Sequence, residues 1–328
     1  MFAPRSPRAC PPIWHRRAAG IAVGFVADLL LGDPRRGHPV AGFGTGAARL
    51  EKLIYADNRR AGVLHTGLLL GGLTGLGWAA GRGERIWVTA VATYVALGGT
   101  SLNRVGAQMS TRLQNADLDG ARALLPSLCG RDPAALDASG LTRATVESLA
   151  ENTSDAQVAP LLWAAIGGVP GVLVYRGANT LDAMVGHRSP RYNHFGWAAA
   201  RFDDVLNYLP ARLTGLLAAL CAPVVGGSPR AALRAWRRDA ARHPSPNAGV
   251  AEASFAGALG VCLGGPTQYA HQLEIRPTLG DGRMPEVADV ARAVRLSRAV
   301  QVSAAAVSVL LVAVSGACRS GRRSSPRR

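Results

Sequence analysis

The stretch Ala159 to Tyr175 reads APLLWAAIGGVPGVLVY and carries no charge over its whole length. Crossing the hydrocarbon core of a bilayer takes about 20 mostly apolar residues, within a range of about 17–25. The stretch therefore predicts a membrane helix, and Pro170 is expected to kink it. Dense polar segments flank it on both sides. They can form one site only if the stretch is kinked, re-entrant or a buried core helix, because a straight crossing would put them on opposite sides.

Further apolar runs predict more helices of this kind. They are Ala18 to Leu31, Gly62 to Ala80, Ile86 to Gly99, Leu213 to Gly227 and Val302 to Ala317. Together the runs predict an all-α, multi-spanning helical membrane protein with about five or six apolar helices. Almost every loop between them is basic, and such loops cannot all lie on the cytoplasmic side. We therefore expect some runs to be interfacial or re-entrant, with the short runs Ala18 to Leu31 and Leu213 to Gly227 as the first candidates.

The composition supports a membrane protein and excludes several other classes. Hydrophobic residues make up 48% of the 328 residues and charged residues only 18%, whereas soluble domains carry about 25% charge. The net charge of +16 comes from Arg residues scattered between apolar runs, without a nucleic-acid motif, so no nucleic-acid partner is expected. Lys52 is the only lysine and lies outside any P-loop pattern. The five cysteines are isolated, which argues against a zinc site or a disulfide framework.

The domain organisation follows from the positions of the charges. Residues 1–17 form a basic N-terminal tail, residues 18–318 a single helical membrane domain, and residues 319–328 a basic C-terminal tail with five Arg. Within the domain, residues 100–155 and 228–296 predict polar extramembrane segments, the first helical and the second rich in turns. No stretch has the period-two alternation of a strand. The basic C-terminal tail is placed in the cytoplasm.

The first polar flank contains three acids with helical spacing. Glu147, Glu151 and Asp155 lie at i, i+4 and i+8, so on a helix they share one face, with Asn152 beside them. Like charges at this spacing repel unless a cation or a basic partner lies between them. The pattern fits a metal or phosphate–metal site at the membrane boundary, and it fits equally a solvated acidic face.

The second polar flank follows the apolar stretch. Its candidate residues are Asn179, Asp182, Arg201, Asp203, Asp204 and Arg212. Ionisable residues near a membrane are costly, so the default interpretation is a functional site; ordinary juxtamembrane ion pairs are the alternative. Farther along, a proline-rich turn could present His243 and Asn247, although a histidine beside prolines is more often structural. Asp28 in the first apolar run needs a partner, since a lone buried charge is expensive.

Several strings of this sequence resemble one known family. They are Leu31-Gly32-Asp33-Pro34 with His38-Pro39-Val40, Gly130-Arg131-Asp132-Pro133, Glu147 to Asp155 (ESLAENTSD), Asn179 to Gly186 (NTLDAMVG), Ala200 to Asp204 (ARFDD), Pro210-Ala211-Arg212, His243 to Gly249 (HPSPNAG) and Gly257 to Gly260 (GALG). In content and order they are similar to the CobD/CbiB family, the adenosylcobinamide-phosphate synthases of cobalamin biosynthesis. The chain departs from the family pattern at Asp155-Ala156, where Asp-Gly is usual, and at Gly249-Val250-Ala251-Glu252, where a Gly-Tyr-Pro-Glu-like string is expected.

The resemblance implies a multi-pass enzyme of the cell membrane. It implies an ATP-dependent ligase that joins adenosylcobyric acid to (R)-1-amino-2-propanol or its O-phosphate through an amide bond. ATP and Mg²⁺ are expected, a tightly bound cofactor is not, and the active site is expected to face the cytoplasm. Other late enzymes of cobalamin assembly are candidate partners. A membrane scaffold or a transporter for corrinoid intermediates is the alternative function.

The chemistry of amide formation suggests roles for the polar residues. Carboxylates can act as bases or bind a cation, and Arg can hold phosphate. We expect catalytic roles for Glu147, Glu151, Asp155, Asp182 and His243, substrate or phosphate binding by Asn152, Asn179, Arg201, Arg212 and Asn247, and metal binding by Asp203 and Asp204.

Overall fold

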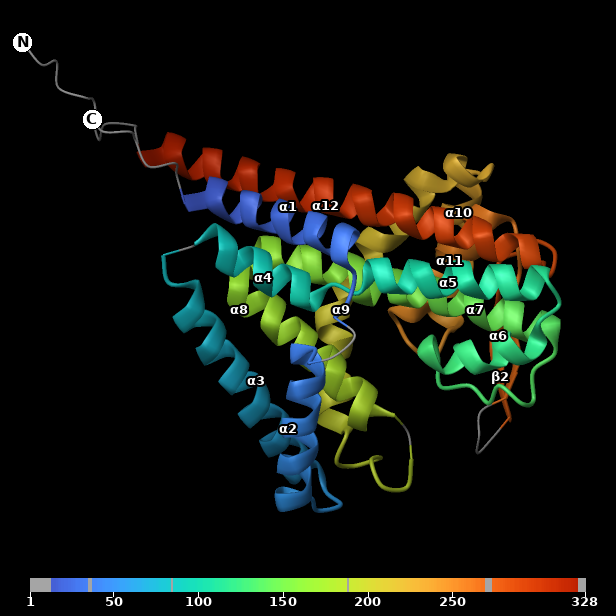
Figure 1. The fold of residues 1–328 in the computed structure, drawn as a ribbon, viewed down its shortest axis with the longest axis horizontal. Helices are drawn as coiled ribbons and strands as arrows, with labels where there is room; N and C mark the ends of the chain where they lie inside the picture. The colour runs from blue at the N-terminus through green and yellow to red at the C-terminus, as the bar shows by residue number, and fades with distance from the viewer. Residues whose placement is uncertain (1–12, 35–36, 84, 188, 269–272, 324–328) are drawn as a thin grey trace, which may run out of the picture.

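The computed structural model describes residues 13–34, 37–83, 85–187, 189–268 and 273–323, most of which are helical (Figure 1). Most of the predicted N-terminal tail and the end of the C-terminal tail lie outside these residues. The elements are α1 Ile13–Leu31, α2 Pro39–Ile54, α3 Arg59–Gly81, α4 Ile86–Ala96, α5 Gly99–Gln114, α6 Leu118–Leu124, η1 Leu125–Ser127, α7 Ala138–Thr153, η2 Ser154–Val158, α8 Ala159–Leu181, η3 Asp182–Gly186, α9 Trp197–Cys221, η4 Ala222–Val225, α10 Pro229–Asp239, η5 Ala240–Arg242, α11 Ala248–Leu259, β1 Leu263–Gln268, β2 Leu273–Leu279 and α12 Val287–Arg323.

The predicted all-α membrane fold is confirmed. Within the described residues, four helical segments are long and apolar enough to cross a membrane, namely Arg59–Gly81, Ala138–Gly186, Trp197–Val225 and Val287–Gly316. Two further predicted runs form shorter or more polar helices, because α4 has 11 residues and α1 contains charged residues at both ends. Leu213 to Gly227, a candidate for an interfacial or re-entrant run, lies mostly within the candidate span Trp197–Val225 that begins with α9.

One antiparallel hairpin, β1 and β2, interrupts the helices, with Leu263 opposite Leu279. The expectation that the chain has no strand is wrong here. Gly264, Gly265 and Pro266 occupy β1 and hide the period-two pattern. Both glycines have φ of 85°, a conformation that glycine alone adopts readily, and the register shifts at this point.

Close backbone approach holds α1 against α4 (Figure 1). A Cβ on Gly20 would lie 2.6 Å from the Thr89 Cβ, and a Cβ on Gly24 would lie 2.6 Å from the Ala90 carbonyl oxygen. Small residues four apart allow helices to pack this closely in lipid, where packing rather than the hydrophobic effect drives association. The glycines therefore fix α1 closely against α4.

The expected partner for Asp28 is present at the other end of α1. Its Oδ2 accepts hydrogen bonds from the Thr100 backbone N at 3.2 Å and the Thr100 hydroxyl at 3.0 Å. The Gln301 amide donates to the same oxygen at 3.0 Å. Because Thr100 lies in the first turn of α5, the carboxylate also accepts from an otherwise unpaired N–H group at the N-terminus of that helix. Asp28 thus ties α1, α5 and α12 together.

The central apolar stretch doubles back on itself. Helix α8 breaks at Gly168, whose φ of 60° and ψ of −147° belong to a conformation nearly exclusive to glycine. Beyond the break the second arm returns along the first, since a Cβ on Gly171 would lie 2.7 Å from the Trp163 carbonyl oxygen. The Tyr175 hydroxyl lies 2.9 Å from the Asp155 carbonyl oxygen, whereas a straight helix would separate these residues by about 30 Å. The stretch is a helical hairpin.

This hairpin, from Asp155 to Asp182, brings the two polar flanks to one side. Asp155 lies 13 residues before Gly168 and Asp182 lies 14 after it, so each arm is about 20 Å long, short of the hydrocarbon core of about 30 Å. Irregular backbone at membrane depth is tolerated where protein surrounds it, and this segment is the most buried of the four candidate spans. Arg17 satisfies one carbonyl freed by the break, donating to Ala165 at 3.4 Å. The hairpin is therefore re-entrant in form.

Candidate active site

Four aspartates gather at the open end of the hairpin. Asp155 comes from η2, Asp182 from η3, and Asp203 and Asp204 from α9. Asp155 interacts electrostatically with Asp203 and Asp182, and Asp203 interacts with Asp182 and Asp204. Four like charges at one place cost free energy unless protons, cations or a substrate offset them. The cluster is therefore suited to binding and to proton transfer rather than to stability.

The local backbone at both edges of the hairpin is unusual. η2 and η3 are π-helical turns, and each begins beside or at its aspartate. Such turns are rare, occur mostly as single insertions and are frequent at functional sites. They reorient Asp155 and Asp182 relative to the helices α7 and α8.

A hydrogen-bond network holds the aspartates in place. The Tyr175 hydroxyl lies 3.0 Å from Asn207 Oδ1, and the Asn207 amide donates to Asp203 Oδ2 at 2.9 Å. Asn179 lies beside Asp203 and accepts a hydrogen bond from Arg176 at 3.4 Å. Asp203 and Asn207 are both buried, so the network positions these groups rigidly. Asn179 thus lies at the aspartate cluster, and its binding role stays a prediction.

Glu147 lies deeper and has partners on both oxygens. The Arg131 guanidinium hydrogen-bonds to Oε2, and the Gly264 backbone N donates to Oε1 at 2.6 Å. These bonds tie α7 to the preceding loop and to β1. With both oxygens engaged, Glu147 acts here as a positioning residue, and its predicted catalytic role stays a prediction.

Glu151 links the two groups of acids. One helical turn after Glu147, it interacts with Arg276 and Arg131 on one side. On the other side it interacts with Asp155 and Asp182. The acidic row predicted on one helix face therefore continues through Glu151 into the aspartate cluster.

A further buried acid, Glu252, meets the same arginines. Its Oε1 lies 3.7 Å from His243 Nε2 and 3.9 Å from Arg276 Nη1. His243 Nδ1 lies 3.1 Å from both the Ser245 backbone N and the Ser245 carbonyl oxygen, which fixes the ring with Nε2 facing Glu252. Burial, together with the charges of Glu147 and Glu151, raises the pKa of Glu252 well above its ordinary value. The predicted residue His243 is thus placed against a buried carboxyl group whose pKa is raised.

Arg212 and Asn247, both predicted to bind substrate or phosphate, contact each other. Arg212 Nη1 donates to Asn247 Oδ1 at 2.7 Å, and the Asn247 amide donates to the Asp204 backbone carbonyl at 2.7 Å. The guanidinium stacks on Tyr208, 3.6 Å from the ring centre. Arg201 lies at the rim, 66% exposed and 3.5 Å from the Asp204 carboxylate. These contacts set two guanidinium groups beside the aspartate cluster.

The Asn152 amide is engaged by its own helix, since it donates to the Ser148 carbonyl and hydroxyl oxygens at 2.9 and 3.1 Å. The predicted binding role of Asn152 stays a prediction.

The oxygen-rich cluster suits Mg²⁺ in type but not as a complete protein cage. Among the described residues, no three His, Cys, Asp or Glu side chains are arranged to hold a metal ion. Mg²⁺ usually binds through one or two carboxylates, with waters and substrate phosphates completing the shell. Asp203 and Asp204 are adjacent on α9 and lie beside Asp182, which fits that pattern. Metal binding by these two residues stays a prediction.

Sequence reasoning assigned no role to Arg131, Tyr175, Asn207, Glu252 or Arg276. Glu252 had a signal, since it is the lone charge in the apolar string of α11, the kind of residue that needs a partner. Arg131 belongs to the string Gly130-Arg131-Asp132-Pro133, but nothing in that string indicates that its partner is Glu147. The other three acquire their roles only through long-range packing.

Comparison with known proteins identifies the family to which the chain belongs. A family model described as CobD/Cbib protein matches residues 21–297. The chain belongs to the CobD/CbiB family. The cobalamin biosynthesis protein CobD of Mycobacterium bovis is 64% identical over 304 residues, which cover 92% of this chain and 97% of that protein. The CobD of Geobacter metallireducens is 43% identical over 278 residues, or 81% and 87% of the two chains. No solved structure matches.

The CobD/CbiB assignment confirms the resemblance and a role in cobalamin biosynthesis. The matched range contains every predicted site residue, from Glu147 to Asn247, as well as Glu252. The acidic cluster is therefore part of the family domain.

Proposed function

We propose that this chain joins adenosylcobyric acid to 1-amino-2-propanol or its O-phosphate through an ATP-dependent amide bond. The substrate carboxylate attacks the γ-phosphorus of ATP, which gives an acyl phosphate and ADP. The amine nitrogen then attacks the acyl carbon, phosphate leaves, and the amine loses a proton to a base. A cobalamin-pathway family and an acid-rich site at a membrane boundary support this reaction.

The observation that carries the proposal is the meeting of acids from three chain segments at the open end of one hairpin. Asp182 is half-buried and is crowded by Asp203 and Asp204. A carboxylate crowded by others binds protons more readily, which suits it to accept the proton of the attacking amine. We assign Asp182 as that base, with Asp155 beside it.

The phosphate-bearing groups need cationic partners at the edge of the cluster. Arg212 is fixed by Asn247 and by its stack on Tyr208, and Arg201 is more exposed. A planar guanidinium held in this way can bind phosphate through two parallel hydrogen bonds. Mg²⁺, held by Asp203 and Asp204 with substrate phosphates, would offset the negative charge that the reaction gathers.

Steady-state assays of Asp182→Asn test the proposal. Detergent-solubilised protein is supplied with adenosylcobyric acid, aminopropanol phosphate, ATP and Mg²⁺, and both cobinamide phosphate and ADP are quantified. Loss of a general base lowers the rate by about 10²–10⁴-fold. Asp119→Asn is the matched control, since that carboxyl is 97% exposed on α6, and its rate should equal that of the wild type. A wild-type rate for both Asp182→Asn and Glu151→Gln would remove the cluster from the reaction.

The same assay separates the enzyme from the alternative functions. A folded wild-type protein that forms no amide and turns over no ATP with either amine would favour a scaffold or a transporter. The broken α8 hairpin is a feature that transporters also use, so this outcome would have a structural basis.

A further inference from the structure

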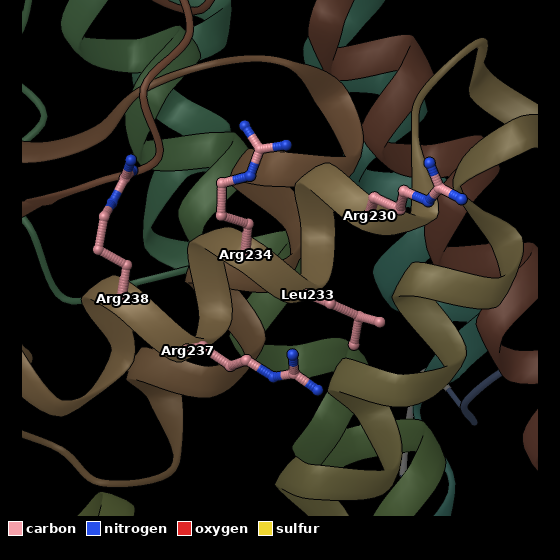
Figure 2. Close-up of a pocket in the computed structure, with 5 residues that line it drawn as sticks. All are labelled: Arg230, Leu233, Arg234, Arg237 and Arg238. Carbon is pink, nitrogen blue, oxygen red and sulfur yellow. The ribbon is translucent and has the colours of Figure 1, made fainter.

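One face of α10 carries three arginines outside the candidate active site. Arg230, Arg234 and Arg237 lie at i, i+4 and i+7, so they share a face of the helix, and all three are exposed. With Leu233 and Arg238 they line a surface hollow of about 490 Å³ (Figure 2). We refer to Arg230, Arg234 and Arg237 as the α10 arginine face.

The nearby acids form their ion pairs with other arginines, although Asp281 also feels the charge of Arg234. Arg238 binds Asp239 at 2.8 Å and Asp281 at 2.9 Å, and Arg242 lies 3.5 Å from Asp239. Among the described residues, no carboxylate oxygen lies within 4 Å of the α10 arginine face. Like charges one turn apart destabilise a helix, and a cation in the first turn opposes the helix dipole. The face is thus electrostatically unfavourable until an anion binds.

This face lies at the end of a candidate membrane span. The segment Trp197–Val225 ends four residues before Pro229 opens α10, and Gly226 makes the turn between them with φ of 71°. Near the end of that span Leu220 and Val224 are 71% and 60% exposed, as expected of side chains that face lipid. The arginines therefore follow the exposed apolar surface within a few residues, where lipid headgroups would lie if this segment crosses the bilayer.

The arrangement of the guanidinium groups decides between two sources of phosphate. A site for one free phosphate or nucleotide would converge its guanidinium groups on a single point. In Figure 2 the arginine side chains instead fan out along α10, and the positions of Arg230 and Arg237 are about 10 Å apart along the helix axis. Separate phosphates at one level are what an anionic lipid surface offers. We propose that the α10 arginine face binds the headgroups of anionic phospholipids in the leaflet at this end of α9.

Lipid titration of the full-length chain tests this assignment. Protein in neutral detergent is titrated with short-chain phosphatidylglycerol, phosphatidylcholine or ATP, and bound molecules are counted by native mass spectrometry. Each Arg near an anionic surface contributes a factor of about 5, so Arg230→Gln/Arg234→Gln/Arg237→Gln should weaken phosphatidylglycerol binding on the order of 100-fold. Single Arg234→Gln should weaken it about 5-fold.

Two matched triple variants sharpen the result. Replacing the three arginines by Lys keeps the charge and should leave phosphatidylglycerol binding within a few fold of wild type. Arg104→Gln/Arg295→Gln/Arg298→Gln removes the same charge from exposed positions on α5 and α12 and should bind like the wild type. Equal binding of phosphatidylcholine and phosphatidylglycerol, or wild-type binding by the α10 Gln variant, would overturn the proposal. Competition by ATP together with failure of the Lys variant would show a compact phosphate site and overturn the lipid assignment.

Discussion

Replacing Gly168 by Ala should loosen the hairpin on which the candidate site depends. At φ of 60° and ψ of −147°, a residue with a Cβ costs about 1–3 kcal/mol more than glycine. The new Cβ would also lie 3.3 Å from the Arg17 guanidinium carbon, tight but at the end of a side chain that can move. Backbone strain therefore dominates, and we expect a loss of about 1–3 kcal/mol in the free energy of unfolding.

Thermal unfolding of the detergent-solubilised protein measures this loss. For a chain of this size, 1–3 kcal/mol corresponds to a fall of roughly 1.5–4.5 °C in Tm. Gly167→Ala is the matched control. Its Cβ would meet only the Trp163 ring, at 4.0 Å, and its helical backbone tolerates alanine, which should leave Tm unchanged or raise it slightly. Equal Tm values for the two variants would refute the turn at Gly168.

The path of the hairpin has a second, independent readout. In a variant without native cysteines, Ser139→Cys precedes the hairpin and His187→Cys follows it, and both positions are exposed. A re-entrant hairpin predicts that a membrane-impermeant maleimide labels both from the same side of a sealed vesicle. Labelling from opposite sides would show that the segment crosses the membrane once. The two polar flanks would then lie on opposite sides and could not form one site.

Three further changes test the surroundings of the site by thermal unfolding. Tyr175→Phe leaves the Asn207 oxygen without its hydroxyl partner and should cost about 1–3 kcal/mol, whereas Tyr208→Phe at an exposed position should cost little. Hydrogen bonds from Arg238 hold the pKa of Asp239 below its ordinary value, so its stabilising contribution is present above about pH 4 and lost as the pH falls through the folded pKa. Asp239→Asn should therefore lower Tm at neutral pH and lose this deficit in acid. The raised pKa of Glu252 has the opposite effect on stability. The free energy of unfolding falls as the pH rises from about 4.3 through the folded pKa, and Glu252→Gln should remove this pH dependence.

Local patterns in the sequence predicted the helices but not the fold-back of the central one. The run Gly62 to Ala80 nearly coincides with α3, because length and apolar composition determine such a helix locally. Pro170 marked a break in the central stretch, but the turn itself lies at Gly168. A glycine can take a positive φ or a helical one, and only the contacts of the second arm with the first select between them.

The acids of the site were predictable and their partners were not. Charged residues beside apolar runs stand out in a membrane protein, which is why Asp182 and Asp203 were found. Arg276 reaches the same acids from β2, and it lies more than 120 residues from Glu151 in the chain. No spacing rule connects positions that far apart. Glu252 could have been found by the argument that gave Asp28 a partner, because it too is a lone acid in an apolar helix.

The row Glu147, Glu151 and Asp155 shows how a correct pattern can conceal different roles. Spacing predicted one acidic face, yet the row is about 12 Å long and meets different neighbours along its length. Glu147 is bound by Arg131 and a backbone N–H, whereas Asp155 lies past the start of a π-helical turn, among aspartates. Glu151 touches both environments, so its charge opposes that of Asp155 while Arg131 and Arg276 stabilise it. Neutralising Glu151 should therefore remove one like charge from the edge of the aspartate cluster, whereas neutralising Glu147 should chiefly release β1 and cost stability.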